Sequence, residues 1–275
     1  MAKAFSVASW NVRHFNGGDA TNAERVAFLA AQEPDVVGIY EVEGKEVWRE
    51  LMAGMPGYSF FITEGRNTQE ILLGIGPGVT AFLTQKIEFQ AENAFMRPGA
   101  LLTVRVDDHY YALLFLHVAS MTGARGFGLR ADMTQRAFEF KETLADAVGE
   151  EPNYVFLGDL NTMGMDYQYG SEGPGHPLKV KVQEAQEVAG LAYQASKVGM
   201  RVLAKSADET YGSPGGLRSN LDHVVVTDHL EFKSFAGSEV HVRGWPQLPE
   251  DEQKAWIETF SDHALLYFEV QRVGS

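Results

Sequence analysis

The chain contains no cysteine among its 275 residues. Disulfides, thiolate-bound metals and cysteine nucleophiles are therefore excluded. No stretch approaches the roughly 20 consecutive apolar residues of a membrane-spanning helix. The N-terminal sequence MAKAFSVASWNV also lacks the long apolar core of a signal peptide. These absences predict a cytoplasmic protein with no integral membrane association, and no feature of the sequence indicates an obligate protein partner.

Positive charge is also scarce. Lys and Arg number 23 against 37 Asp and Glu, a formal net charge of -14. Long-range repulsion from phosphate disfavours tight, sequence-independent binding to duplex nucleic acid. A nuclease is not excluded, because an active site built of metal-binding carboxylates is itself acidic and a bound cation reverses the local sign. The apolar content of 45% and charged content of 22% exclude the disordered and collagen-like classes.

Short apolar runs predict a protein rich in strands. We expect strands at residues 5–10, 35–40, 78–84, 100–106, 110–118, 154–160, 221–227 and 264–270, and helices at 21–34, 45–55, 129–149, 180–190 and 249–260. The two kinds do not alternate strictly, which favours two packed sheets with helices outside over a barrel. No repeat or linker interrupts residues 1–275, so one domain is predicted. The glycine-rich stretches 120–128, 163–176 and 211–220 are expected to form long surface loops.

Polar side chains stand at the ends of several predicted strands. They are Asn11, Glu41, His117, Asp159, Asn161, Asp222, Asp262 and His263. Each alone is most simply a solvated turn residue. As a set they favour a metal site, because carboxylates gathered in one cleft would repel one another unless a hard cation were bound between them. Oxygen ligands suit Mg²⁺ or Mn²⁺, whereas the histidine spacing typical of zinc sites is absent.

The stretch VFLGDLNTMG, residues 155–164, poses the sharpest local question. Side chains two positions apart on an extended chain share a face. Asp159 and Asn161 are therefore expected to point at one spot if the strand geometry continues that far.

The segments SWNVR, PDVVGIYEV, LHVAS, FLGDLN, SNLDHV and SDHALL occur in this order between residues 9 and 266. They resemble the motifs of the endonuclease/exonuclease/phosphatase superfamily, which includes deoxyribonucleases, abasic-site nucleases, bacterial sphingomyelinases and inositol polyphosphate 5-phosphatases. Each motif is short, but their order and domain-wide spacing are specific. The resemblance implies an α/β fold: a four-layer α/β/β/α sandwich, with two mostly antiparallel sheets face to face and helices outside.

The resemblance also implies a metal site and its cofactor. Glu41 matches the metal-binding glutamate, and Asn11 matches the asparagine that helps to hold the metal or the phosphate. Asp262 matches a further metal or water ligand. The expected metal is Mg²⁺, or Mn²⁺ in its place.

The remaining motif residues match catalytic positions. Asp159 corresponds to the aspartate that orients or deprotonates the attacking water, and Asn161 to the asparagine on the scissile phosphate. His263 corresponds to the catalytic histidine, and Asp222 to the carboxylate that holds it. His117 matches a second histidine found in the deoxyribonuclease, sphingomyelinase and phosphatase branches, which distinguishes this chain from the abasic-site nucleases.

Several cations outside the motifs are weaker candidates. Arg125 and Arg130 follow His117, and Arg218 precedes Asp222, so all three could grip phosphate oxygens, or could be solvated loop charges. Lys197, Arg201 and Lys205 recur every four residues, which on a helix would form a basic stripe for nucleic acid, although Gly199 weakens that helix.

The combined prediction is a metal-dependent phosphodiesterase that hydrolyses its substrate by in-line attack of water, most simply a nuclease on DNA or RNA. The alternative is a phosphatase or phospholipase acting on a small or lipid phosphoester. A catalytically silent binding module is least favoured, because Glu41, Asp159 and His263 are all present.

Overall fold

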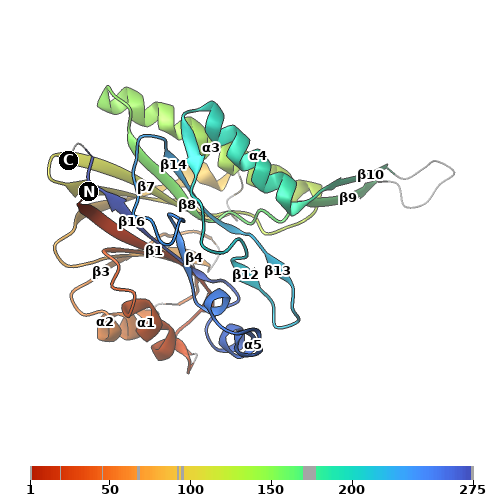
Figure 1. The fold of residues 1–275 in the computed structure, drawn as a ribbon, viewed down its shortest axis with the longest axis horizontal. Helices are drawn as coiled ribbons and strands as arrows, with labels where there is room; N and C mark the ends of the chain where they lie inside the picture. Colours follow the sequence, from red (N-terminus) through yellow and green to blue (C-terminus); the bar gives the residue numbers. More distant parts are fainter. Residues whose placement is uncertain are drawn as a thin grey trace.

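Two six-stranded sheets form the centre of the molecule in the computed structural model, which describes residues 2–18, 20–44, 46–66, 69–91, 93, 96–169 and 178–273 (Figure 1). The first sheet contains, in spatial order, β15 (His241–Arg243), β16 (Leu265–Gln271), β1 (Lys3–Phe15), β2 (Val36–Val42), β4 (Glu70–Ile75) and β3 (Ser59–Ile62). The second contains β11 (Met200–Val202), β14 (Asp222–Thr227), β8 (Asn153–Asp159), β7 (His109–His117), β6 (Gly99–Val106) and β5 (Thr80–Lys86).

Helices cover the outer faces of both sheets. They are α1 (Asn22–Ala30), α2 (Val47–Gly54), α3 (Ala124–Val148), α4 (Glu184–Lys197) and α5 (Glu250–Thr259), with short 3-10 turns at Ile87–Gln90 and Trp245–Gln247. In Figure 1, α3 and α4 lie over the second sheet and α1 and α2 under the first. The predicted α/β/β/α sandwich is therefore confirmed, with one parallel strand pair in each otherwise antiparallel sheet.

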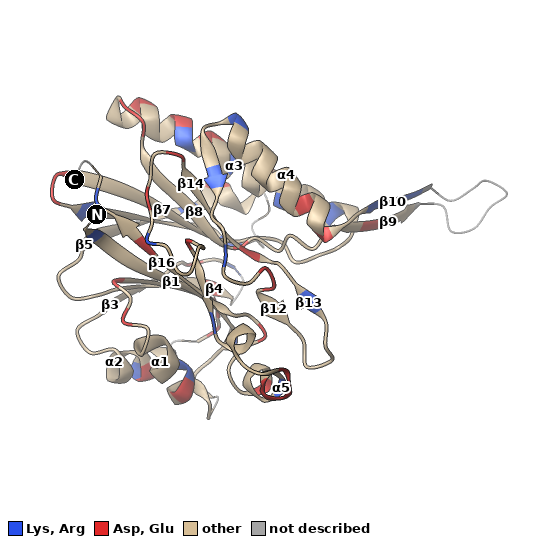
Figure 2. Ribbon diagram, in the orientation of Figure 1, with Lys and Arg blue, Asp and Glu red and all other residues tan. Residues whose placement is uncertain are grey.

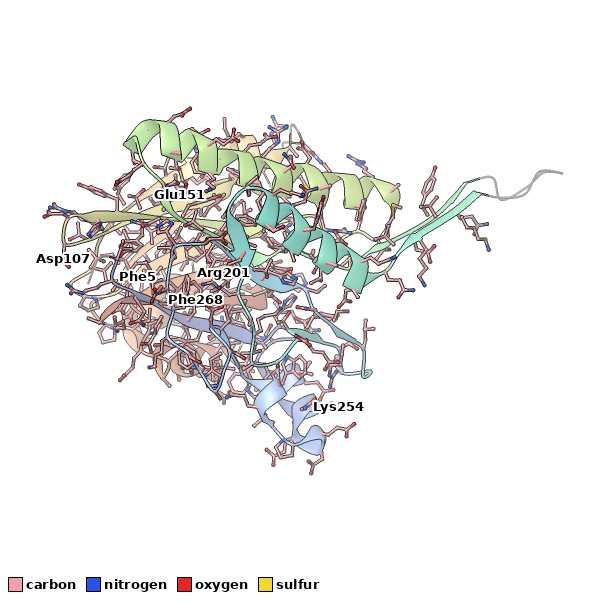
Figure 3. All side chains as sticks on the ribbon, turned by 45° about the horizontal axis from the view of Figure 1, so that its top comes forward. Phe5, Asp107, Glu151, Arg201, Lys254 and Phe268 are labelled. Carbon is pink, nitrogen blue, oxygen red and sulfur yellow. The ribbon has the colours of Figure 1, made fainter. Side chains whose placement is uncertain are left out.

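Three apolar layers hold the sandwich together. The largest lies between the sheets and includes Phe5 and Phe268, which Figure 3 shows in the densely filled middle of the molecule. A second layer joins the second sheet to α3 and α4 through residues such as Met133 and Leu191. A third joins the first sheet to α1 and α2. Burial on both faces explains why the central strands read as continuous apolar runs.

Most predicted elements are confirmed, and the differences have local causes. All eight predicted strands are present. The predicted helix at 129–149 begins earlier, at Ala124, and ends as expected at Gly149, whose left-handed conformation (φ 75°) caps it. The predicted helix at 180–190 is wrong in its first part, because residues Leu178–Val182 form β10 and α4 begins only at Glu184.

Two hairpins replace parts of the predicted glycine-rich loops. β9 (Met165–Tyr169) pairs with β10 and projects away from the sandwich (Figure 1), while residues 170–176 of the predicted 163–176 loop lie outside the described residues. β12 (Tyr211–Gly212) pairs with β13 (Arg218–Ser219) in the second stretch. Among the described residues, no helix is long and apolar enough to span a membrane.

Candidate active site

The residues at the predicted strand ends meet at one edge of the sandwich. β1 and β2 are parallel, as are β7 and β8, so their carboxyl ends lie at the same edge of each sheet. β14 and β16 run antiparallel to these neighbours, which places their first residues at that edge as well. Asn11 and Glu41 of the first sheet are thereby brought against His117, Asp159 and Asp222 of the second.

A cleft of about 530 Å³ opens at this edge. Polar groups that line it include Glu41, His117, Asp159, Asn161, Asp262 and His263. Tyr211 and Leu217 of the β12–β13 hairpin form part of another wall, and the Leu217 side chain is 61% exposed. The cleft therefore joins a polar floor to a partly apolar rim.

Four cleft residues have left-handed backbones, which side chains rarely adopt. They are Arg13 (φ 47°), His14 (φ 52°), Glu41 (φ 61°) and Asn161 (φ 47°). This conformation costs an L-residue roughly 1–2 kcal/mol. Its concentration in one cleft is typical of functional sites, where surrounding structure enforces a strained geometry.

The strained turn in β1 has a visible effect. Between two regular pairings with β2, three β1 residues oppose a single β2 residue. The turn directs the N–H of Arg13 to Oδ1 of Asn11 (2.9 Å) and the N–H of His14 to Oε2 of Glu41 (3.1 Å). Both side chains are thus held in place before any ligand arrives.

Asn11 links the two sheets at the bottom of the cleft. Its Nδ2 donates to Oε1 of Glu41 (3.2 Å) and to Oδ2 of Asp159 (3.0 Å). Nε2 of His117 lies 3.5 Å from the same Asp159 oxygen and 3.9 Å from the same Glu41 oxygen. One amide and one imidazole therefore sit between two carboxylates that come from different sheets.

His263 and Asp222 form a buried dyad. Nδ1 of His263 lies 2.9 Å from Oδ2 of Asp222, and Nε2 lies 3.7 Å from Oδ2 of Asp159. Burial alone would lower the pKa of His263, but the charges of Asp222 and Asp159 outweigh it and raise that pKa to about 10. The imidazole is therefore positively charged at neutral pH, with its Nδ1 proton directed to Asp222.

In Asp159 and His117, unlike His263, the net pKa shift favours the neutral form of the side chain. Burial, reinforced by the charges of Asp222 and Glu41, raises the pKa of Asp159 to about 7, against the effect of His263 and the hydrogen bond from Asn11. Burial, together with the charge of Arg97 and that of His263, lowers the pKa of His117 well below its usual value. The cleft thus combines a carboxylate that titrates near neutrality, one charged imidazole and one neutral imidazole.

Asn161 differs from the expectation in its geometry. β8 ends at Asp159, and the left-handed turn at Asn161 breaks the strand alternation that would have put both side chains on one face. Instead, Oδ1 of Asp159 accepts the N–H of Asn161 (3.1 Å), and Nδ2 of Asn161 donates to the Val118 carbonyl (3.2 Å). Both residues still line the cleft.

The sequence profile of the Endonuclease/Exonuclease/phosphatase family matches residues 8–263, nearly the whole chain. The chain belongs to the endonuclease/exonuclease/phosphatase family. It is an enzyme of the phosphoric ester hydrolase class that this family comprises. No curated protein matches the sequence.

Solved structures of family members share the fold at low sequence identity. Danio rerio TDP2 in complex with a single-strand DNA product has a TM-score of 0.59 and 15% identity, over 98% of this chain and 99% of that one. The catalytic domain of human nocturnin with bound sulfate gives 0.61 and 11%, over 98% and 93%. A Staphylococcus aureus beta toxin gives 0.60 and 12%, over 96% and 99%.

The donor set of the cleft fits the divalent metal on which family enzymes generally depend. Ligand atoms of Asp159, Asp222 and His263 lie within 4.8 Å of one another. Asp222 and His263 are already hydrogen-bonded to each other, whereas the neighbouring Glu41 and Asp159 oxygens share the Asn11 amide and lie near Nε2 of the neutral His117. Burial, reinforced by the charges of Asp222 and Glu41, raises the pKa of Asp159, and a bound cation would oppose that effect.

The arginines predicted to hold phosphate are not brought together in the cleft. Arg218 donates to the Ser213 and Leu217 carbonyls, and its guanidinium lies 4.7 Å above the Trp245 ring. Arg130 is only 1% exposed, and its N–H groups are used inside the protein. Phosphate binding by these two is therefore not supported by the geometry. Arg125 is exposed in the first turn of α3, and its role stays a prediction.

Two cations near the site gave little signal in the sequence. Arg97 donates Nε to the Gln69 carbonyl (2.9 Å); burial lowers its pKa, while Glu41 and Asp159 raise it, which places its charge near these carboxylates. Lys205 donates Nζ to the carbonyl of Asp222 (2.6 Å). The helix on which Lys197, Arg201 and Lys205 would have formed a basic stripe is not present, because α4 ends at Lys197 and a strand follows.

Proposed function

We propose that this enzyme is a Mg²⁺- or Mn²⁺-dependent phosphodiesterase whose substrate is nucleic acid, DNA or RNA. The observation that carries the proposal is the convergence in one cleft of the Asp159 carboxylate, the His263–Asp222 dyad and the Asn11–Glu41 pair. A carboxylate with a pKa of about 7 lies 3.7 Å from an imidazolium held by a second carboxylate. A general base works best when its pKa is close to the operating pH.

Asp159 and His263 take complementary roles in this proposal. Because Nε2 of His263 is close to Oδ2 of Asp159, both groups would lie on the same side of a bound phosphate. Asp159 orients the attacking water and accepts its proton. His263, kept charged by Asp222, neutralises negative charge that develops on the phosphate oxygens. Water attacks phosphorus in line with the departing ester oxygen, without a covalent enzyme intermediate.

The remaining polar residues bind and orient. Asn11, Asn161 and the neutral His117 surround the position that the phosphate would occupy. Glu41, with Asn11 and Asp262, would hold the divalent cation. That cation would polarise the phosphate and stabilise the charge on the leaving oxygen.

Nucleic acid is favoured as substrate by the form of the cleft and by one family member. The cleft lies open at an edge of the sandwich, beside the aromatic ring of Tyr211. A family member of the same fold, D. rerio TDP2, binds a single-strand DNA product. The alternative substrate considered in the sequence analysis, a small or lipid phosphoester, requires the same catalytic groups. Only an assay of both kinds of substrate distinguishes it from nucleic acid.

The test compares esters under controlled metal conditions. Bis-p-nitrophenyl phosphate, single- and double-stranded DNA, RNA and a phosphomonoester would each be incubated with Mg²⁺, with Mn²⁺ and with EDTA. We expect metal-dependent cleavage of nucleic acid and of the diester. His263→Ala should lower kcat by about 10²–10⁴-fold. His109→Ala, at the exposed start of the same strand that ends in His117, is the matched control and should keep full activity.

Two results would overturn parts of the proposal. Full activity of His263→Ala would remove the catalytic assignment. Cleavage of the small esters alone would keep the catalytic groups and exclude nucleic acid as substrate.

A further inference from the structure

Arg130 has every donor of its guanidinium engaged within the protein. Nε and Nη2 donate to Oε1 (2.8 Å) and Oε2 (3.0 Å) of Glu187 on α4. Nη1 donates to the carbonyl of Met121 (2.6 Å) and, more weakly, to that of Ala119 (3.4 Å). Nη2 also donates to the Gly164 carbonyl (2.6 Å). A buried side chain on α3 is thereby bonded to three other segments of the chain.

The acceptors belong to the two loops that leave the catalytic strands. Ala119 and Met121 follow His117 at the end of β7, and Gly164 follows Asp159 at the end of β8. Glu187 completes the link, because its Oε2 also accepts the N–H of Gly164 (2.7 Å). Both the N–H and the carbonyl of Gly164 are therefore held by one ion pair.

The surrounding glycines show that this arrangement tolerates little displacement. A Cβ on Gly126 of α3 would collide with the carbonyl oxygen of Met121, which Arg130 binds. Gly164 has a φ of 75°, and a Cβ there would collide with the carbonyl oxygen of Val182. The loop at Met121 therefore packs against α3, and the loop at Gly164 packs against Val182, so closely that neither glycine position has room for a Cβ.

Stability alone does not explain a buried ion pair of this kind. Removing two charges from water is expensive, and replacement of such a pair by apolar residues is often neutral or stabilising. What an arginine uniquely supplies is a rigid, planar fork that binds several acceptors in fixed relative positions. We therefore expect the Arg130–Glu187 pair to fix the relative positions of the two loops.

We propose that Arg130 and Glu187 form a positioning clamp for the catalytic groups, which fixes the His117 loop relative to the Asp159–Asn161 loop. The inference rests on the proposed phosphodiesterase function for its kinetic readout. Arg130 touches neither substrate nor metal in this scheme and acts through the backbone carbonyls of both loops. The shape of the guanidinium, more than its charge, sets the spacing between the loops.

A cavity provides a way to test the shape requirement chemically. A space of about 300 Å³ lies between α3 and α4 and is lined by Arg130, Glu187, Phe127 and Leu191 among others. Truncation of Arg130 to alanine would extend this cavity to the buried acceptors. A small guanidinium ion added to the solution could then occupy the position of the missing group.

The first experiment compares Arg130→Lys with Arg136→Lys on bis-p-nitrophenyl phosphate. Arg136 is the matched control, because it lies on the same helix and pairs with a carboxylate, Asp132, at the surface. A displacement of about 1 Å in an active site can cost roughly 10²-fold in rate. We expect Arg130→Lys to lower kcat by about that factor with little change in KM, and Arg136→Lys to match the wild type. Unchanged kcat in folded Arg130→Lys would overturn the clamp.

The second experiment tests rescue. Arg130→Ala should be nearly inactive, and millimolar ethylguanidinium should restore kcat by at least about tenfold, whereas ethylammonium should not. Equal rescue by both ions would show that charge suffices and would overturn the shape requirement. If Arg130→Ala does not fold, Glu187→Gln takes its place as the second variant, with the same expected loss of kcat at unchanged KM.

A spectroscopic readout separates the clamp from the proposed function. If the wild type cleaves no ester, the function fails, and the clamp is then judged from imidazole ¹⁵N–¹H spectra. Arg130→Lys should shift the His117 resonances, while those of the distant surface residue His109 stay unchanged. Identical His117 resonances in the variant and the wild type would reject the clamp whatever the activity.

Discussion

Asp159 shows at the scale of one residue how the site opposes stability. Its carboxyl is buried beside Asp222 and Glu41, and its pKa is raised to about 7. The folded protein therefore holds a proton that the unfolded chain has already released above about pH 4. The contribution of Asp159 to the free energy of unfolding therefore falls as the pH rises from about 4 to 7, because in this range the folded state alone binds that proton.

Asp159→Asn should consequently be more stable than the wild type in EDTA at pH 8, by about 1–3 kcal/mol. Denaturant unfolding at pH 8 and at pH 4.5 measures this difference. The gain should shrink at pH 4.5, where the wild-type carboxyl is protonated. A variant less stable than the wild type at pH 8 would contradict the unfavourable burial of this charge. Activity should be lost in either case.

Sequence reasoning worked at this scale for residues whose direction follows from a strand end. Asp159, Asp222 and Glu41 were identified as polar residues at strand ends and matched to family motifs, and the parallel and antiparallel strand pairs bring those ends together. Arg130 lay inside the predicted helix at 129–149, but the sequence does not show whether its guanidinium turns inward or toward solvent. The left-handed turn at Asn161 likewise leaves no mark in the residue types around it.

At the scale of elements, Gly158 allows the parallel strands β7 and β8 to approach closely enough to place His117 beside Asp159. A Cβ there would collide with the Leu116 carbonyl oxygen on β7 and lie 2.6 Å from the Tyr40 hydroxyl. Its φ of 134° is also strained for any side chain. The parallel pair can therefore place His117 beside Asp159 only if residue 158 is glycine.

Gly158→Ala should lower the free energy of unfolding by about 3 kcal/mol and move the two catalytic residues apart. Gly128→Ala is the matched control: it lies within α3, a Cβ there meets no atom within 4 Å, and helix propensity should raise stability by up to about 1 kcal/mol. Thermal unfolding of both variants measures the contrast. Equal melting temperatures would show that the close approach at Gly158 is relieved by movement of β7.

Element prediction from sequence succeeded where burial imposed a pattern and failed where it did not. Most of the strands that are buried on both faces were visible as apolar runs, but the buried strand β4 was missed. The β9–β10 hairpin has no such core: β9 lay within a glycine-rich stretch that indicates a loop, and β10 overlapped the start of the predicted helix at 180–190. The three-residue strand β11 gains its pairing from β14, more distant along the chain, whereas β12 and β13 are two-residue strands, too short to form a periodic pattern.

At the scale of the whole molecule, negative charge on both sheets meets at the cleft, so metal binding there should affect how stably the two sheets pack together. The net charge is -14, and acidic residues occur along helices and loops throughout the molecule (Figure 2). At the cleft, Glu41 of the first sheet faces Asp159 of the second, and only Asn11 and His117 lie between them. A divalent cation held by Glu41, Asn11 and Asp262 of the first sheet would attract the Asp159 carboxylate of the second and so oppose separation of the two sheets.

Mg²⁺ should therefore raise the melting temperature. At 100 times the dissociation constant, ligand linkage adds about 2.7 kcal/mol, which for a chain of this size is a shift of about 5 °C. Glu41→Gln should abolish the shift, whereas Glu258→Gln, which removes the same charge from the surface of α5, should keep it. The shift should also shrink at pH 5.5, because Asp159 is then protonated and contributes less negative charge beside the cation. An equal shift in both variants would mean that Mg²⁺ acts by screening the acidic surface and that the strand ends do not form its site.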